Sequence, residues 1–398
     1  MNTRVIPALR PQTRHGRFPL DTWTLGTVVI LLALGLVMVG SASISIAERQ
    51  TGDAFYFLWR QTAFVGVGLL AGYAVLFMRL VYWERLGHVL LGFGLFLLVV
   101  VLLVGREVNG SVRWLALGPF NLQPSELMKL FMVVYLAGYL VRRGEEVRSS
   151  VKGFLKPMGL VALMGVLLLA EPDFGAAAVI TATVLGMMFL GGVRLWQFGL
   201  LFLVMGTAAG VLAFSSPYRL ARLTSFANPW ADPFNSGFQL TQALIAFGRG
   251  EWLGVGLGGS IQKLFYLPEA HTDFLYAVLA EELGLVGGVV VIALFAVLVW
   301  RAFVIGKTAA EAGNRFGAYL AYGLGLWLGM QAFINLGVNM GVLPTKGLTL
   351  PLMSYGGSSI VVSCIACALL LRVSHEHPVE KGPGARRLVP AVKGRASP

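Results

Sequence analysis

Residues 266–284 read YLPEAHTDFLYAVLAEELG, and the chain then stays apolar up to Arg301. Pro268 is expected to end the preceding segment, and Thr272 to cap a helix that begins at Asp273. A helix from Asp273 to Arg301 would be roughly 43 Å long at about 1.5 Å per residue, against about 30 Å of hydrocarbon in a bilayer. The excess length predicts that Asp273 lies above one membrane surface and faces water, where a carboxylate can reach a soluble head group.

The amino-acid composition places the chain among polytopic membrane proteins. Of its 398 residues, 57% are apolar and 13% are charged, and the mean hydropathy is +0.75. These values lie outside the range of soluble globular proteins. The net charge of +12 would suggest nucleic acid in a soluble protein, but in a membrane protein it is typical of basic cytoplasmic loops. We therefore expect no nucleic-acid partner.

The apolar runs predict an all-α membrane domain of ten transmembrane helices over residues 22–373. The first span runs from Trp23 to about Gly40, and because it is longer than the core of a signal peptide we expect it to be retained as an anchor. The other nine spans are centred near residues 68, 95, 133, 163, 182, 204, 288, 328 and 362. Residues 1–21 and 374–398 form basic tails at the two ends.

The distribution of basic residues orients this arrangement. Placing both tails in the cytoplasm puts 21 of the 31 Lys and Arg residues on the inner side, as the positive-inside rule requires. One long loop, about 215–272 between helices seven and eight, then lies outside together with Asp273. The loop carries too many apolar side chains for disorder, so we expect short amphipathic helices and turns packed on the outer face.

Two groups of ionisable residues lie near the predicted span ends. Glu126 and Lys129 are three residues apart and share one helical face, so they form either a structural ion pair or part of a functional site. Glu171 and Asp173 lie in a short outer turn, where they are either solvated or able to bind cations or sugar hydroxyls. The sequence leaves both alternatives open.

Basic residues are also expected on the outer side. They are solvated loop charges unless they cluster at the membrane surface, where they would suit a phosphate-bearing lipid. This set comprises Arg113, Arg219, Arg222 and Lys263.

Two further patterns predict no cofactor or metal site. Gly254, Gly256 and Gly259 match GxGxxG but follow no strand, which favours a glycine-rich hinge over a nucleotide site. Cys364 and Cys367 lie one turn apart in an apolar span, where they are expected to pack as small apolar side chains.

Many short motifs occur in a fixed order along the chain. They are RWL at 113–115, QPSELMK at 123–129, PDFG at 172–175, LPEAHTDF at 267–274, EELG at 281–284 and PLMSYGGS at 351–358. Together they resemble the shape, elongation, division and sporulation (SEDS) family, and the resemblance covers residues 22–373. The runs AFGRG at 246–250, EAH at 269–271 and NMGVLPTKG at 339–347 are similar to the division branch rather than the elongation branch. Glu171 departs from the family pattern, which usually has Gln.

The resemblance implies a peptidoglycan glycosyltransferase of the bacterial inner membrane that polymerises lipid II at the division septum, with its active site on the periplasmic side. It implies an FtsI-like class B penicillin-binding transpeptidase and other division proteins (FtsQ-, FtsL- and FtsB-like) as partners, besides membrane lipid. It leaves open a divalent cation at the pyrophosphate. A lipid II flippase and a non-catalytic division scaffold are the alternative functions.

Asp273 is the residue that we expect to act as the general base. Glycan extension requires a sugar hydroxyl to attack an anomeric carbon that carries undecaprenyl pyrophosphate, and a carboxylate that takes the hydroxyl proton is the minimal catalyst. Inversion at that carbon needs no protein nucleophile. The substrate-binding residues expected from charge and from the resemblance are Arg113, Glu126, Lys129, Asp173, Arg219, Arg222, Lys263, His271, Thr272 and Ser358.

Overall fold

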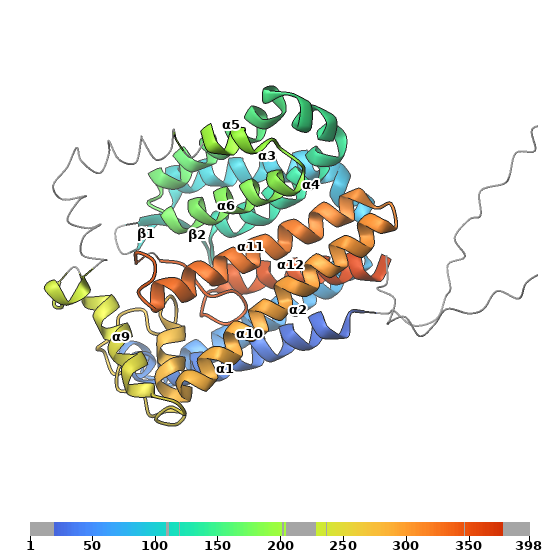
Figure 1. Cartoon of the computed structure of the whole chain (residues 1–398). Helices are drawn as coiled ribbons and strands as arrows, with labels where there is room; N and C mark the ends of the chain where they lie inside the picture. Colours follow the sequence, from blue (N-terminus) through green and yellow to red (C-terminus); the bar gives the residue numbers. More distant parts are fainter. Residues whose placement is uncertain are drawn as a thin grey trace, which may run out of the picture.

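The protein is a bundle of helices that lie side by side (Figure 1). The structure, a computed structural model, describes residues 20–108, 111–118, 120–200, 203, 228–235, 237–345 and 347–376. The helices are α1 (Thr22–Thr51), α2 (Tyr56–Phe77), α3 (Leu80–Val104), α4 (Pro124–Ser149), α5 (Val151–Ala170), α6 (Phe174–Leu190), α9 (Phe238–Gly250), α10 (Leu275–Glu311), α11 (Arg315–Asn339) and α12 (Gly357–Glu376). A short 3-10 helix, η1, spans Pro229–Ala231.

The described helices lie at nine of the predicted span positions, although α6 and α11 are not among the helices long and apolar enough to cross a membrane. Within the described ranges, seven helices are long and apolar enough to cross a membrane (α1 to α5, α10 and α12), and α6 is apolar but only 17 residues long. Nine of the ten predicted span positions fall on described residues, and each lies in a helix. The position near residue 204 lies outside the described residues, as do 1–19 and 377–398 of the tails. The chain is an integral membrane protein, and the count of ten spans stays a prediction.

The centre of the bundle is formed by α4, α11 and α12. In the most apolar stretches of α4 and α12, 83% and 78% of the residues are buried, compared with 28% in α2, α3, α5 and α10. Small residues let the helices approach closely, as is usual in membranes. A Cβ at Gly68 of α2 would lie 3.0 Å from the sulfur of Cys364 in α12.

A small antiparallel sheet occupies the connection between α3 and α4, so the all-α prediction was wrong here. Strand β2 (Ser111–Leu117) pairs on one side with β1 (Arg106–Val108) and on the other with β3 (Phe120–Leu122). Leu115 packs with Leu97 and Val101 of α3, which fixes the sheet to the bundle.

The helix near Asp273 also differs from the prediction. Helix α10 begins at Leu275, its N-cap residue Phe274 makes no side-chain hydrogen bond, and the Thr272 hydroxyl donates to the Glu269 carboxylate at 2.7 Å. The helix is broken at Gly284, where φ is 66° and ψ is −167°. The expected continuous helix is therefore a short helix over residues 275–283 followed by a long one from residue 285.

Two glycines with positive φ make this break possible. Gly254 has φ +81°, and a Cβ there would lie 2.2 Å from the carbonyl oxygen of Glu282. The amide of Val255 donates to the carbonyl of Glu281 at 3.0 Å, which joins the loop to the end of the short helix. Gly254 thus permits a close backbone crossing, a role that the GxGxxG pattern did not reveal.

Candidate active site

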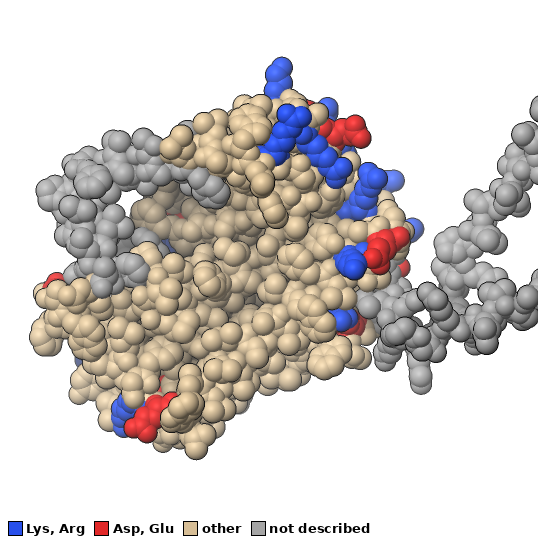
Figure 2. Space-filling view, viewed as in Figure 1, with Lys and Arg blue, Asp and Glu red and all other residues tan. Residues whose placement is uncertain are grey.

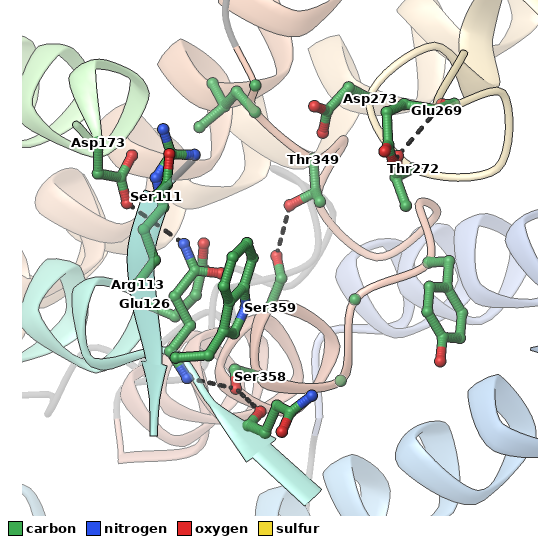
Figure 3. A pocket seen from close by; sticks show the side chains of 18 of the residues that line it. Ser111, Arg113, Glu126, Asp173, Glu269, Thr272, Asp273, Thr349, Ser358 and Ser359 are labelled. Carbon is green, nitrogen blue, oxygen red and sulfur yellow. Dashed lines mark hydrogen bonds between the residues drawn. The ribbon is translucent and has the colours of Figure 1, made fainter. Parts of the chain in front are cut away.

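A cavity of about 670 Å³ lies in the described part of the chain. Its wall combines the sheet, the start of α4, the turn before α6, the segment before α10, residues 345–349 and the start of α12 (Figure 3). The polar side chains that line it are Arg60, Ser111, Arg113, Asn121, Gln123, Glu126, Asp173, Gln239, Glu269, Thr272, Asp273, Thr345, Thr349, Tyr355, Ser358 and Ser359.

Asp273 and Arg113 approach the same small space from two sides of this cavity. A Cβ at Gly347 would lie 3.1 Å from Oδ2 of Asp273 and 3.7 Å from a terminal nitrogen of Arg113. A side chain at position 347 would therefore fill the space between the carboxylate and the guanidinium. In Figure 3, Asp273 and Glu269 lie on one side of the cavity, with Arg113 and Asp173 on the other.

The surroundings of Asp273 raise its pKa to about 7. Burial is the largest cause, and the carboxylates of Glu269 and Asp173 raise the pKa further, while the guanidinium of Arg113 lowers it. A carboxylate whose pKa lies near neutral pH is well matched to accept a proton in a reaction at that pH.

Arg113 is held by the turn that precedes α6. Its Nε donates to the carbonyl oxygen of Glu171 at 3.3 Å, and a terminal nitrogen donates to the carbonyl oxygen of Pro172. Leu115, two residues further along β2, anchors the sheet. The guanidinium is therefore fixed beside the cavity by backbone contacts, so a negatively charged ligand can bind it without displacing a carboxylate partner.

Asp173 is buried, which excludes the alternative that this turn is simply solvated. Its Oδ2 accepts hydrogen bonds from Ser125 Oγ at 2.8 Å and from Gln123 Nε2 at 3.3 Å, and its Oδ1 caps α6 through the amide of Ala176 at 3.1 Å. Asp173 therefore ties the start of α4 to the start of α6 at the cavity wall.

Glu171 is a buried carboxyl group, and neither of its oxygens has a hydrogen-bond partner among the described residues. Burial and the neighbouring Asp173 raise its pKa to about 8, against the opposing charge of Arg113. Because the native state favours the protonated form, ionisation of Glu171 should cost stability as the pH rises from about 4.5 through about 8.

Glu171→Gln should remove this cost. We expect the melting temperature of the wild-type protein to fall between about pH 6 and pH 9 by more than that of the variant, since Gln cannot ionise. Thermal unfolding of the detergent-solubilised proteins at several pH values measures the difference. Parallel curves for the two proteins would show that Glu171 does not ionise in this range.

Glu126 and Lys129 form a buried ion pair beneath the cavity. The Lys129 Nζ donates to Glu126 Oε1 at 2.8 Å and to Gln331 Oε1 at 2.7 Å, and it lies 5.7 Å from the ring centre of Trp327. Glu126 lines the cavity, whereas Lys129 does not. The hydrogen bond from Lys129 to Gln331 joins α4 to α11, which favours the structural ion pair, and the Glu126 side chain lines the cavity.

Of the other predicted residues, Thr272 and Ser358 line the cavity and His271 lies behind its wall. The His271 ring packs between Phe57 and Tyr355, with ring centres 4.7 and 5.4 Å away. Burial lowers the pKa of His271, so the ring is neutral at physiological pH.

Lys263, expected among the substrate-binding residues, does not line the cavity. Its Nζ donates to Glu282 Oε1 at 2.7 Å and to Ser41 Oγ at 2.9 Å, which ties the outer loop to α1. Arg219 and Arg222 lie outside the described residues.

Arg60 is a cavity residue that sequence reasoning missed. It lies on α2 within an apolar run, where one Arg near a helix end is usually a boundary charge. Its guanidinium contacts Tyr56 through a hydrogen bond of 2.8 Å. Among the described residues, Arg60 and Arg113 are the basic side chains that line the cavity.

Comparison with known proteins identifies the family of this chain. A family model described as "Cell cycle protein", covering FtsW, RodA and SpoVE, matches residues 22–378. The chain belongs to this family. The resemblance to SEDS proteins is thereby confirmed, and the match spans all seven of the candidate membrane helices.

Individual members of the FtsW, RodA and SpoVE family are similar over most of the chain. A protein of Nitrosococcus halophilus (strain Nc4) named "Probable peptidoglycan glycosyltransferase FtsW" is 65% identical over 358 residues, which is 89% of this chain and 92% of that protein. A protein of the same name from Thioalkalivibrio sulfidiphilus (strain HL-EbGR7) is 61% identical over 90% of both chains.

Two solved structures share the fold. One is described as "Structural coordination of polymerization and crosslinking by a peptidoglycan synthase complex"; its matching chain has a TM-score of 0.75 and 32% identity, with 90% of this chain and 98% of that chain covered. The other is the rod shape determining protein RodA of Thermus thermophilus, with a TM-score of 0.63, 31% identity, and coverage of 90% and 97%.

Proposed function

We propose that this protein is a peptidoglycan glycosyltransferase that polymerises lipid II, with Asp273 as its general base. The observation that carries the proposal is the cavity in which the Asp273 carboxylate, its pKa raised to about 7, faces Arg113 across the space at Gly347. The names of the FtsW relatives supply the reaction class.

The proposed reaction is a direct displacement. The acceptor sugar hydroxyl gives its proton to the Asp273 carboxylate while its oxygen forms a bond to the anomeric carbon of the donor. The bond from that carbon to the pyrophosphate oxygen breaks, and its electron pair leaves with undecaprenyl pyrophosphate. Arg113 stabilises the negative charge on the leaving group. Attack from the opposite face inverts the anomeric carbon.

The remaining cavity residues would bind the sugars. Glu126, Asp173, Thr272 and Ser358 line the cavity and offer acceptors and hydroxyls for the disaccharide. A divalent cation at the pyrophosphate would neutralise charge there. No group of three or more His, Cys, Asp or Glu side chains suited to a metal occurs in the described ranges.

The proposed topology has ten spans, cytoplasmic ends and a periplasmic cavity. Figure 2 supports it, because most of the Lys and Arg side chains on the visible face gather at one end, around the α4–α5 connection and the junction of α10 and α11. Positive charge marks the cytoplasmic end. The cavity lies at the other end, beside the sheet and α9.

Cysteine labelling tests this orientation, since the native Cys364 and Cys367 are buried. A cysteine at Asn235 should react with a membrane-impermeant maleimide in cells whose outer membrane is permeabilised and whose inner membrane is intact. A cysteine at Lys307 should react only after the inner membrane is opened. The reverse pattern would contradict the proposed topology and the periplasmic site.

The proposed partners and location follow from the relatives. The solved synthase complex is described by both polymerisation and crosslinking, which supports pairing with a class B penicillin-binding transpeptidase. The FtsW name of the relatives supports a role at the division septum beside other division proteins.

Polymerisation of lipid II by the purified protein with its transpeptidase partner tests the proposed function. We expect glycan strands when the transpeptidase active site is blocked. Transbilayer movement of lipid II in vesicles without glycan would favour the flippase, and neither activity would favour the scaffold.

A further inference from the structure

Three buried amide side chains follow one face of α11. The three residues are Gln331, Asn335 and Asn339. Each lies four residues after the one before it, a spacing that aligns side chains on one side of a helix. Their exposed fractions are 1%, 2% and 0%. We call these three residues the amide ladder. Burying an amide is costly unless it is hydrogen-bonded, so the partners of the ladder indicate its role.

Two residues of the amide ladder, Asn335 and Asn339, bind the backbone at Asp273. The Nδ2 atoms of Asn335 and Asn339 donate to the carbonyl oxygen of Asp273 at 2.8 and 2.9 Å. The Oδ1 of Asn339 also accepts from the amide of Ala277 at 3.1 Å, in the first turn of α10. Because Phe274 at the N-cap provides no side-chain hydrogen bond, Asn339 caps α10 from a different helix.

The same ladder holds the cavity wall next to Asp273. Asn335 Nδ2 donates to the carbonyl oxygen of Leu348 at 2.6 Å, and Gln331 Nε2 donates to that of Thr349 at 3.0 Å. Leu348 directly follows Gly347, the residue beside the carboxylate and the guanidinium. Asn335 thus links the segment that carries the carboxylate to the wall that shapes the space in front of it.

We propose that Asn335 and Asn339 are positioning residues for glycosyl transfer, which hold the Asp273 backbone so that its carboxylate faces the acceptor hydroxyl. This inference rests on the proposed role of Asp273. A general base must come within about 2.6–3.2 Å of its proton donor, and a displacement of about 1 Å can cost about 100-fold in rate. The ladder acts through the backbone, so it sets the place of the base without touching the substrate.

Substitution of the ladder should change kcat and its pH dependence. Asn335→Leu keeps the branching at Cγ but adds volume and cannot make the side-chain hydrogen bonds of Asn335, and Asn339→Ala removes the cap of α10. We expect kcat to fall about 10-fold to 100-fold, with the KM for lipid II changed by less than about threefold, since the ladder lies behind the cavity wall. The acid limb of the pH profile should move to lower pH, because a loosened Asp273 is hydrated and its pKa falls from about 7 toward 3.8.

Asn314→Ala is the matched control on the same helix. Asn314 caps the other end of α11 through the amide of Gly317, roughly 32 Å from Asn335 at about 1.5 Å per residue. The control should lower the melting temperature and leave both kcat and the acid limb unchanged.

Two results would overturn the proposal while Asp273→Asn remains inactive. One is wild-type kcat and an unmoved acid limb in both ladder variants. The other is a loss of kcat that follows the melting temperature without any movement of the acid limb, which is the signature of a packing role. Activity of Asp273→Asn itself would instead remove the proposed base, and the ladder inference would fall with it.

Discussion

Asp273→Asn is expected to abolish visible glycan while leaving a folded protein that still binds its transpeptidase partner. Asn keeps the size and hydrogen-bonding groups of Asp but cannot accept the proton of the acceptor hydroxyl. The loss of a general base typically costs about 10²-fold to 10⁴-fold in rate. The backbone contacts from Asn335 and Asn339 to residue 273 do not involve its side chain, so the variant should keep the local fold.

The competing explanation, that Asp273 only stabilises a helix end, predicts a small effect. Such an interaction is worth about 0.3–1 kcal/mol, and the first turn of α10 is already capped by Asn339 through the amide of Ala277. Polymer length and initial rate, measured with purified complexes and lipid II, separate the two. Asp53→Asn, an exposed change in the α1–α2 turn, is the control and should polymerise at the wild-type rate. Near-normal glycan from Asp273→Asn would return the choice of base to the other carboxylates that line the cavity, Glu126, Asp173 or Glu269.

Breaking the Glu126–Lys129 pair is expected to have the largest effect on stability. Lys129→Met leaves Glu126 as a lone charge with an exposed side-chain fraction of 5%, and removal of one partner from a buried pair costs about 3–5 kcal/mol. The double variant Glu126→Gln with Lys129→Met leaves no unpaired charge. It should therefore be more stable than Lys129→Met alone.

Thermal unfolding in detergent measures these differences without relying on activity, which Glu126 also affects through the cavity. Lys156→Met, which disturbs an exposed pair with Glu146, is the control for loss of a surface charge and should change stability by about 0–1 kcal/mol. Equal, small shifts in the single and double variants would show that the buried pair contributes nothing.

The positions of the membrane helices could be predicted because lipid demands long apolar runs, and these are visible in the sequence. The sequence also indicated the cavity residues Asp273 and Asp173, because carboxylates are conspicuous in an apolar chain. The small sheet could not be found in this way. Its strands are short, and their stability depends on contacts such as that of Leu115 with α3.

Other features depend on contacts between distant parts of the chain. The break at Gly284 needs a close approach by Gly254, and a glycine inside a helical pattern does not by itself signal a positive φ. The sequence indicates no partner for Lys263, and only the folded structure places Ser41 and Glu282 beside its ammonium group. The sequence could not reveal these pairings, because spacing along one segment does not determine which segments meet.

The pH dependence of kcat/KM for lipid II tests the central claim most directly. A base must be deprotonated to act, and Asp273 has a pKa of about 7, so the rate constant should fall about tenfold per pH unit below pH 7 and level off above it. The purified wild-type complex should show this limb. A rate constant that stays flat from about pH 5 to pH 8, in a protein that remains folded across that range, would contradict the assignment of Asp273 as the general base.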